Sequence, residues 1–77
     1  MKFHFNLSDD VYTQDEDGRD LPDIHAARRY AETNAKIMAA ESVRNGLLNL
    51  LHYVEVTDGA GDFLLKVTFG EVVAVSS

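Results

Sequence analysis

Apolar and polar residues alternate in two stretches of the 77-residue chain, one on each side of a longer helical pattern. Alternation with a period of two is typical of strands that bury one face. It predicts four strands, over Lys2–Leu7, Val11–Gln14, Tyr53–Thr57 and Asp62–Phe69. In the first of them Phe3, Phe5 and Leu7 share one face. The Asp-Gly-Ala-Gly sequence at 58–61 separates the last two strands and is typical of a hairpin turn.

The middle of the chain predicts one long helix. Asp23 follows Pro22 and suits the N-cap position, because its carboxylate can accept hydrogen bonds from the first free amides of the helix. Asn45-Gly46 suits the other end, since glycine adopts the left-handed conformation that closes many helices. Between these ends a stripe of mostly small residues recurs at three- and four-residue spacing: Ile24, Ala27, Ala31, Ala35, Met38 and Ser42. This stripe indicates that the helix lies close against a sheet.

The order strand, strand, helix, strand, strand predicts an α+β fold: a four-stranded antiparallel sheet with one long helix packed on one face. A chain of 77 residues is expected to form a single domain spanning 1–77. It has no cysteine, so no disulfide can support its small core. The leucines of the connector, residues 47–51, are expected to close one end of that core. The alternation leaves the strand order open.

The charge balance narrows the range of partners. The chain has 13 acidic and 7 basic residues and a net charge of −6, which disfavours nucleic acid and anionic membranes through repulsion. No apolar run approaches the roughly 20 residues that a membrane-spanning helix needs. The start, Met1-Lys2-Phe3-His4-Phe5, lacks the long apolar core of a secretion signal. A cytoplasmic protein that does not enter membranes is therefore expected.

An acidic stretch after the second predicted strand invites comparison with a calcium loop. It contains Asp15, Asp17, Asp20 and Asp23. With Gly18 as the central glycine of such a loop, Thr13 and Ile24 occupy the first and last ligand positions, where carboxylates are needed. The three histidines, at positions 4, 25 and 52, fall on separate elements without paired spacing. No metal or other cofactor is predicted, and whether the acidic turn Asp15–Asp23 binds a cation stays open.

Nothing in the chain predicts catalysis. The serines stand outside any glycine-flanked nucleophile motif, and the acidic residues are placed as surface charges. One helix on one sheet also encloses little volume for a substrate pocket. A non-enzymatic protein without an evident small-molecule substrate is expected. A nucleic-acid partner is not expected either, because the outward sheet face lacks the paired aromatic residues that stack on bases.

Apolar residues outside the predicted core suggest an interaction surface. On the helix, Tyr30 and Ile37 lie off the alanine stripe. On the sheet, Tyr53 and Leu64 point outward by alternation, and the segment Val72–Val75 is too apolar for a free end. The predicted interface residues are Tyr30, Ile37, Tyr53, Leu64, Val72, Val73 and Val75. They favour a homodimer or a complex with another protein.

Several motifs together resemble a known family. They are Phe3-His4, Asp15-x-x-Gly18-x-Asp20-Leu21-Pro22-Asp23, the helix alanines, and Tyr53-Val54-Glu55-Val56-x-Asp58-x-x-Gly61. The chain resembles, over nearly its whole length, a family of short bacterial proteins known as domain of unknown function 6894. It departs from the family pattern at Tyr53, where tryptophan is common, and in its leucine-rich connector. The resemblance implies an architecture and a bacterial cytoplasmic setting, and it supplies no catalytic residue to transfer.

Two functions follow as expectations. The first is a small non-enzymatic protein-interaction domain that self-associates. The alternative is an antitoxin-like regulatory module acting through a protein or RNA partner, since the expected architecture is similar to small antitoxin domains with a helix on an antiparallel sheet. That similarity concerns the fold alone, and a fold does not determine function.

Overall fold

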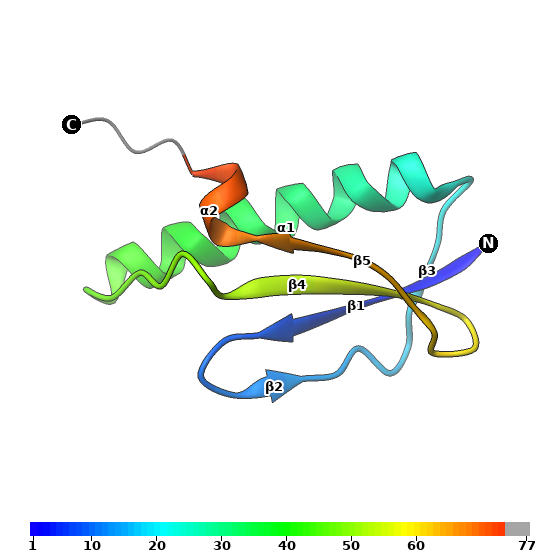
Figure 1. Cartoon of the computed structure of the whole chain (residues 1–77), viewed down its shortest axis with the longest axis horizontal. Helices are drawn as coiled ribbons and strands as arrows, with labels where there is room; N and C mark the ends of the chain where they lie inside the picture. The colour runs from blue at the N-terminus through cyan, green and yellow to red at the C-terminus, as the bar shows by residue number, and fades with distance from the viewer. Residues whose placement is uncertain (74–77) are drawn as a thin grey trace.

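A computed structural model of the protein describes residues 1–73 and contains five strands and two helices in that range. In chain order they are β1 (Lys2–Ser8), β2 (Tyr12–Thr13), β3 (Arg19–Asp20), α1 (Ile24–Arg44), β4 (Tyr53–Asp58), β5 (Phe63–Thr68) and α2 (Phe69–Val72). The strands form one antiparallel sheet in the order β2-β1-β4-β5, with β3 also paired to β1 (Figure 1). The long helix α1 crosses one face of this sheet, so the predicted α+β architecture is confirmed.

The sheet has one strand more than predicted. The chain after β2 does not only bend away but returns to β1, where Lys2 pairs with Asp20 and Phe3 with Arg19. The backbone of Met1 and Leu21 continues this pairing, since the Leu21 amide donates to the Met1 carbonyl at 2.9 Å. The prediction of four strands was wrong here because two-residue strands leave no alternation to recognise in a sequence.

The segment between β2 and β3 lies in close contact with β1 at Gly18. Gly18 has a φ of +73°, in the left-handed region that favours glycine. A Cβ atom at this position would lie 3.0 Å from the Phe3 carbonyl oxygen and 3.0 Å from Cε1 of His4. Gly46, with a φ of +89°, ends α1 as predicted, but a Cβ there would meet nothing within 4 Å.

The helix begins and ends close to the predicted residues. The Asp23 carboxylate accepts a hydrogen bond from the Ala26 amide at 2.8 Å and caps the first turn. The face that packs on the sheet consists of alanines, all of them buried: Ala27, Ala31, Ala35 and Ala39. Because these side chains are small, large residues of the strands fill the space between the two layers. Ile24 was predicted on this stripe but lies largely outside it, partly exposed at the first turn.

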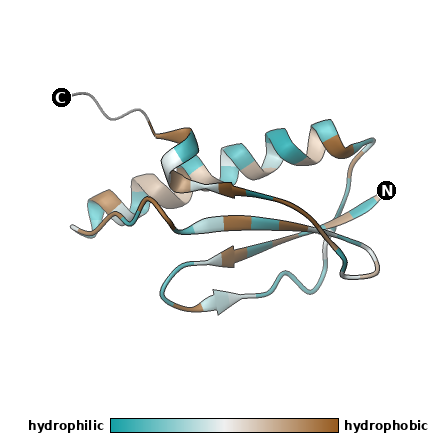
Figure 2. Ribbon diagram, viewed as in Figure 1, coloured by the Kyte–Doolittle hydropathy of each residue, from teal (hydrophilic) through white to brown (hydrophobic). Residues whose placement is uncertain are grey.

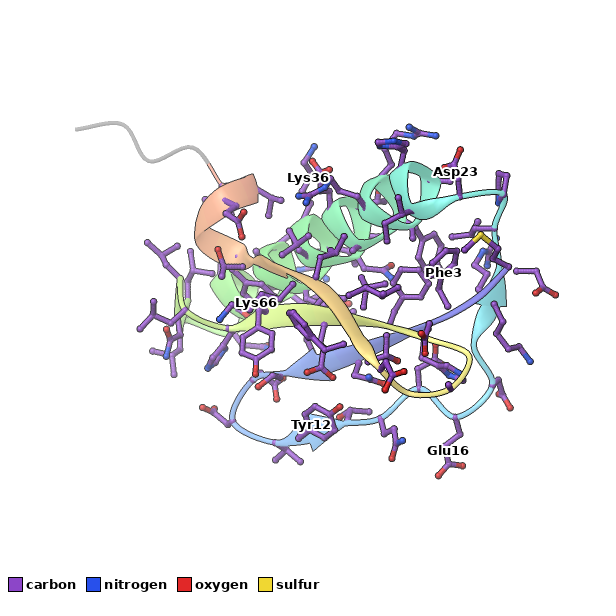
Figure 3. All side chains as sticks on the ribbon, turned by 45° about the vertical axis from the view of Figure 1, so that its right-hand side comes forward. Phe3, Tyr12, Glu16, Asp23, Lys36 and Lys66 are labelled. Atoms are coloured by element: carbon purple, nitrogen blue, oxygen red, sulfur yellow. The ribbon has the colours of Figure 1, made fainter. Side chains whose placement is uncertain are left out.

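The core between the layers takes most of its volume from the sheet. Phe3, Val54, Val56 and Val67 are fully buried, together with Phe69 of α2. Figure 3 shows Phe3 pointing from β1 towards α1, whereas Glu16 points away from the body of the protein. The apolar face predicted for the first strand is therefore confirmed at Phe3, and Val54 and Val56, which alternate with the outward Tyr53 in β4, are buried on the same side.

The end of β5 differs from the predicted strand over Asp62–Phe69. The strand stops at Thr68, whose hydroxyl caps the short helix α2 while the Glu71 carboxylate accepts from the Thr68 amide at 2.7 Å. At its other end, an irregular register between Val56 and Thr57 leaves Phe63 opposite Thr57 and exposed, although alternation placed it inward.

The connector between α1 and β4 was predicted to close the core, and this expectation was wrong for most of it. Leu48 packs against the core, but Leu47, Leu50 and Leu51 are exposed, with Leu51 at 80%. The connector backbone is fixed instead by α2, because the Gly70 amide donates to the Leu50 carbonyl at 3.0 Å. Figure 2 shows this segment as an apolar stretch at the end of the protein where α1 stops.

Candidate interaction surface

The residues predicted as interface candidates lie in different environments. Tyr30 is half-buried rather than free, since its ring meets the ring of Phe5 edge-on at 4.6 Å between centroids. The Arg19 guanidinium lies 4.7 Å from the centre of the same ring. Tyr30 therefore seals the β1 side of the layer between α1 and the sheet, a role that its position off the alanine stripe did not reveal.

The outward face of the sheet is more polar than the predicted interaction surface with Tyr53 and Leu64 implied. Tyr53 is half-buried, and the Lys66 ammonium lies 4.9 Å from the centre of its ring. Leu64 is 40% exposed. Around them, the Glu55 carboxylate accepts from the Asn6 amide nitrogen at 3.1 Å and from the Tyr12 hydroxyl at 2.9 Å. This face offers little continuous apolar area for a partner.

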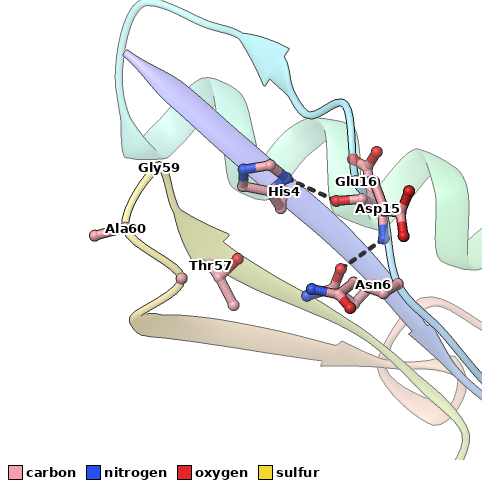
Figure 4. Close-up of a pocket in the computed structure, with 9 residues that line it drawn as sticks. His4, Asn6, Asp15, Glu16, Thr57, Gly59 and Ala60 are labelled. Atoms are coloured by element: carbon pink, nitrogen blue, oxygen red, sulfur yellow. Dashed lines mark hydrogen bonds between the residues drawn. The ribbon is translucent and has the colours of Figure 1, made fainter.

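Tyr12 and Asp15 show how this polar face is organised. Partial burial raises the pKa of Tyr12, and its hydrogen bond to Glu55 adds to the increase. Burial alone would raise the pKa of Asp15, but hydrogen bonds from the amides of Gly18 and Phe5 outweigh it and lower that pKa. Figure 4 shows the neighbouring bonds, in which the Asp15 carbonyl faces the His4 ring and the Asp15 amide donates to Asn6.

Asp15 therefore connects the segment before β3 to β1, and we refer to it as the Asp15 hub. Its contacts give the acidic stretch a structural role. Each carboxylate oxygen of Asp15 accepts from a backbone amide, at 3.1 Å from Phe5 and 3.1 Å from Gly18. Within residues 1–73 no three His, Cys, Asp or Glu side chains stand close enough together to hold a metal ion. The chain pattern did not reveal this hub, because the register that brings Asp15 beside β1 depends on the short strands β2 and β3.

Apolar surface gathers instead on the side of β5 and α2. A groove of about 290 Å³ runs between α1 and α2. We refer to it as the α1–α2 groove; its lining residues are Lys36, Ala39, Ala40, Val43, Val72 and Val73. Val72 and Val73 are half-buried and also pack against the core. Exposed Ile37 lies one helical turn before Ala40, and Val75 falls outside the described residues.

The same side of the protein carries the edge of the sheet. β4 pairs with one side of β5, and no strand within residues 1–73 pairs with the other. The Phe69 amide donates to the His52 carbonyl, on the β4 side, at 2.8 Å. Because alternate residues of a regular strand direct their amides to the same side, the amides of Lys66 and Thr68 face away from β4, and the Thr68 amide already donates to the Glu71 carboxylate. The edge therefore presents the free backbone amide of Lys66 next to the groove.

Comparison with known proteins gives a family. Residues 2–70, from β1 to the beginning of α2, match the family described as "Domain of unknown function (DUF6894)". The chain belongs to this family. The DUF6894 match includes the Asp15 hub, the edge strand β5 and most of the groove, but it assigns no activity to any of them. No curated protein and no solved structure matches the chain significantly.

The helices also bear on the expectation that the chain does not enter membranes. Across residues 1–73, no helix is both long enough and apolar enough to cross a bilayer. The long helix α1 carries charged residues along its length, including Arg28, Lys36 and Glu41.

Proposed function

We propose that this protein is a non-enzymatic protein-interaction domain of the cytoplasm that self-associates through the side formed by β5 and the α1–α2 groove. The observation that carries the proposal is the free edge of β5 lying beside an apolar groove. Proteins that remain monomeric protect such edges with proline, charged side chains or a covering loop. A second copy of the chain would form hydrogen bonds with the free edge of β5 and cover the groove at the same time.

The edge itself is poorly protected against pairing. Over its six residues β5 contains no proline and one charged residue, Lys66. The Lys66 ammonium lies over the Tyr53 ring rather than across the edge. The bulge between Val56 and Thr57 lies at the hairpin end of β5, so the rest of the strand is regular. An isologous dimer would place two β5 strands side by side and antiparallel, extending the sheet across both copies.

The groove supplies the apolar contact that hydrogen bonds at an edge lack. Lys36 is the one charged residue in its lining within residues 1–73. Two copies of an acidic chain would therefore meet there without bringing carboxylates of the groove together. Burial of Val43 and of the exposed flanks of Val72 and Val73 would contribute roughly 25 cal/mol for each Å² removed from water.

Light scattering after size exclusion, over a series of concentrations, tests the proposal. The wild-type chain is expected to form a dimer. Leu64→Glu on β5 and Ala40→Glu in the groove should each shift it to the monomer, because they place carboxylates in the interface. Val11→Glu is the matched control, since Val11 is 69% exposed beside β2 at the opposite edge of the sheet.

The other outcomes are equally informative. A monomer at every concentration would refute self-association and direct attention to a different protein partner, as in the antitoxin-like alternative. A dimer that persists in both variants but is lost in Leu51→Glu would place the interface at the exposed connector instead. Binding of RNA that weakens with added salt would favour the RNA version of that alternative.

A further inference from the structure

The open edge of β5 offers few backbone groups to a second copy of the chain. The pairing of β5 with β4 is regular from Leu65 to Thr68. In this stretch the amides of Lys66 and Thr68 face away from β4, and the Thr68 amide donates to the Glu71 carboxylate at 2.7 Å. Within residues 1–73, Lys66 therefore holds the one free amide of the regular stretch, and its carbonyl group faces the same side.

The contacts of Glu71 keep Thr68 from pairing with another strand. The Glu71 carboxylate accepts from both the amide and the hydroxyl of Thr68, and the Glu71 amide donates to the same hydroxyl at 3.3 Å. The hydrogen bonds from Thr68 lower the pKa of Glu71, and the nearby charges of Arg28 and Lys66 add to the decrease. The carboxylate therefore stays ionised at neutral pH. A strand that paired with the Thr68 amide would have to break this capping box.

The symmetry of a dimer turns the single free amide into a register. Two identical strands related by a two-fold axis pair antiparallel. With the axis at Lys66, each Lys66 amide donates to the Lys66 carbonyl of the other copy, and Leu64 lies opposite Thr68. A register that places Lys66 opposite Thr68 loses one of the two bonds of the pair, because the Thr68 amide is already engaged. A register that places Lys66 opposite Leu64 reaches the irregular part of the strand.

We propose that two copies pair through β5 with Lys66 opposite Lys66, and that this residue sets the register of the dimer and limits its strength. The inference rests on the self-association proposed above and names the contact at its centre. Side chains of directly opposite residues lie on the same face of a sheet, and like charges placed there destabilise the pair. Lysine at an edge strand limits pairing in this way, so the dimer should be reversible.

The position of the Lys66 side chain is compatible with this arrangement. Its ammonium group lies 4.9 Å from the centre of the Tyr53 ring, on the β4 side of the strand (Figure 3). In the described part of the chain no carboxylate forms an ion pair with it. Each copy therefore turns its ammonium group away from the open edge, but the two positive charges stay uncompensated across the axis.

Exchange of the charge at this position tests the register. A mixture of the wild type and Lys66→Glu should form more heterodimer than random pairing gives, because an ammonium group then faces a carboxylate. Native mass spectrometry with an isotope-labelled wild type measures the proportions of the three dimers. Lys2→Glu is the matched control, since it makes the same change of charge at an exposed residue of β1 and should mix at random.

Removal of the charge gives a second readout. Lys66→Gln should lower the Kd of the dimer by about two- to fivefold, although it makes an acidic chain more acidic. Lys2→Gln has the same effect on net charge and should not lower the Kd. Light scattering over a concentration series measures both variants, and circular dichroism checks that each one is folded.

The outcomes separate this inference from the proposal on which it rests. Random mixing of Lys66→Glu with a dimeric wild type would overturn the Lys66 register and leave self-association intact. An unchanged or higher Kd in Lys66→Gln would do the same, and this variant supplies the answer if Lys66→Glu fails to fold. A wild type that stays monomeric at every concentration would overturn both proposals.

Discussion

Replacement of Gly18 by alanine tests whether the acidic segment is held against β1 as tightly as the geometry indicates. A residue other than glycine at a φ of +73° costs about 1–2 kcal/mol. The new Cβ would also stand 3.0 Å from the Phe3 carbonyl oxygen, a backbone atom that cannot move away without disturbing β1. We estimate that this contact adds about 1 kcal/mol, similar to mild overpacking of a core.

One effect acts in the opposite direction. Alanine restricts the unfolded chain more than glycine does, which returns about 0.4–1 kcal/mol. The net loss for Gly18→Ala should therefore be about 2 kcal/mol. In a domain of this size it corresponds to a decrease in Tm of roughly 10 °C.

Gly46→Ala is the matched control, because Gly46 has a φ of +89° and open space around the position of a Cβ. It should lose about 1 kcal/mol, from the backbone conformation alone. Urea unfolding followed by circular dichroism gives both free energies of unfolding. Equal losses in the two variants would refute the reasoning, since they would mean that the segment around Gly18 can move away from Phe3 and His4 without cost.

Two further predictions concern the helix layer and the response to pH. Ala31→Leu should destabilise the protein by about 1–3 kcal/mol, because the buried alanine leaves no room against the sheet, whereas Arg29→Leu at an exposed position of α1 outside the α1–α2 groove should stay within about 0.5 kcal/mol in urea unfolding. Since the pKa of Asp15 is lowered in the folded state, its contribution to stability is present above the ordinary carboxyl pKa and is lost as the pH falls through the folded pKa. Asp15→Asn should therefore be less stable than the wild type at pH 7, and the difference should shrink below about pH 4; a difference that grows in acid would contradict this.

The fold was predictable where a segment signals its own structure. The N-cap at Asp23, the glycine end at Gly46 and the alternation of β1 and β4 are local patterns, and each is confirmed. The short elements β3 and α2 were missed, because two to four residues carry too little periodicity. The connector was wrong for a different reason. Leucine favours burial, but α2 holds the connector by its backbone, which leaves three leucine side chains outside.

The candidate sites depend on register, which the sequence pattern does not contain. Leu64 and Val72 could be recognised as surplus apolar residues, but their placement around one edge and one groove required the order of the strands. Lys66 is an ordinary exposed lysine until its amide is known to lie on the open side of β5. The half-burial of Tyr30 likewise depends on Phe5, which is distant in sequence.

The central place of β1 has a consequence for how the chain reaches its native state. The strand at the start of the chain pairs along its length with β4, and its partners Asn6 and Glu55 are 49 positions apart. During synthesis β1 emerges well before β4, and until β4 follows it can pair only with the two-residue strands β2 and β3. Non-local pairing of this kind slows folding, because a long loop must close, with a loss of entropy, before the contacts between the strands can stabilise it. We therefore expect the sheet and its core to form together and late, with α1 the one element able to gain structure earlier.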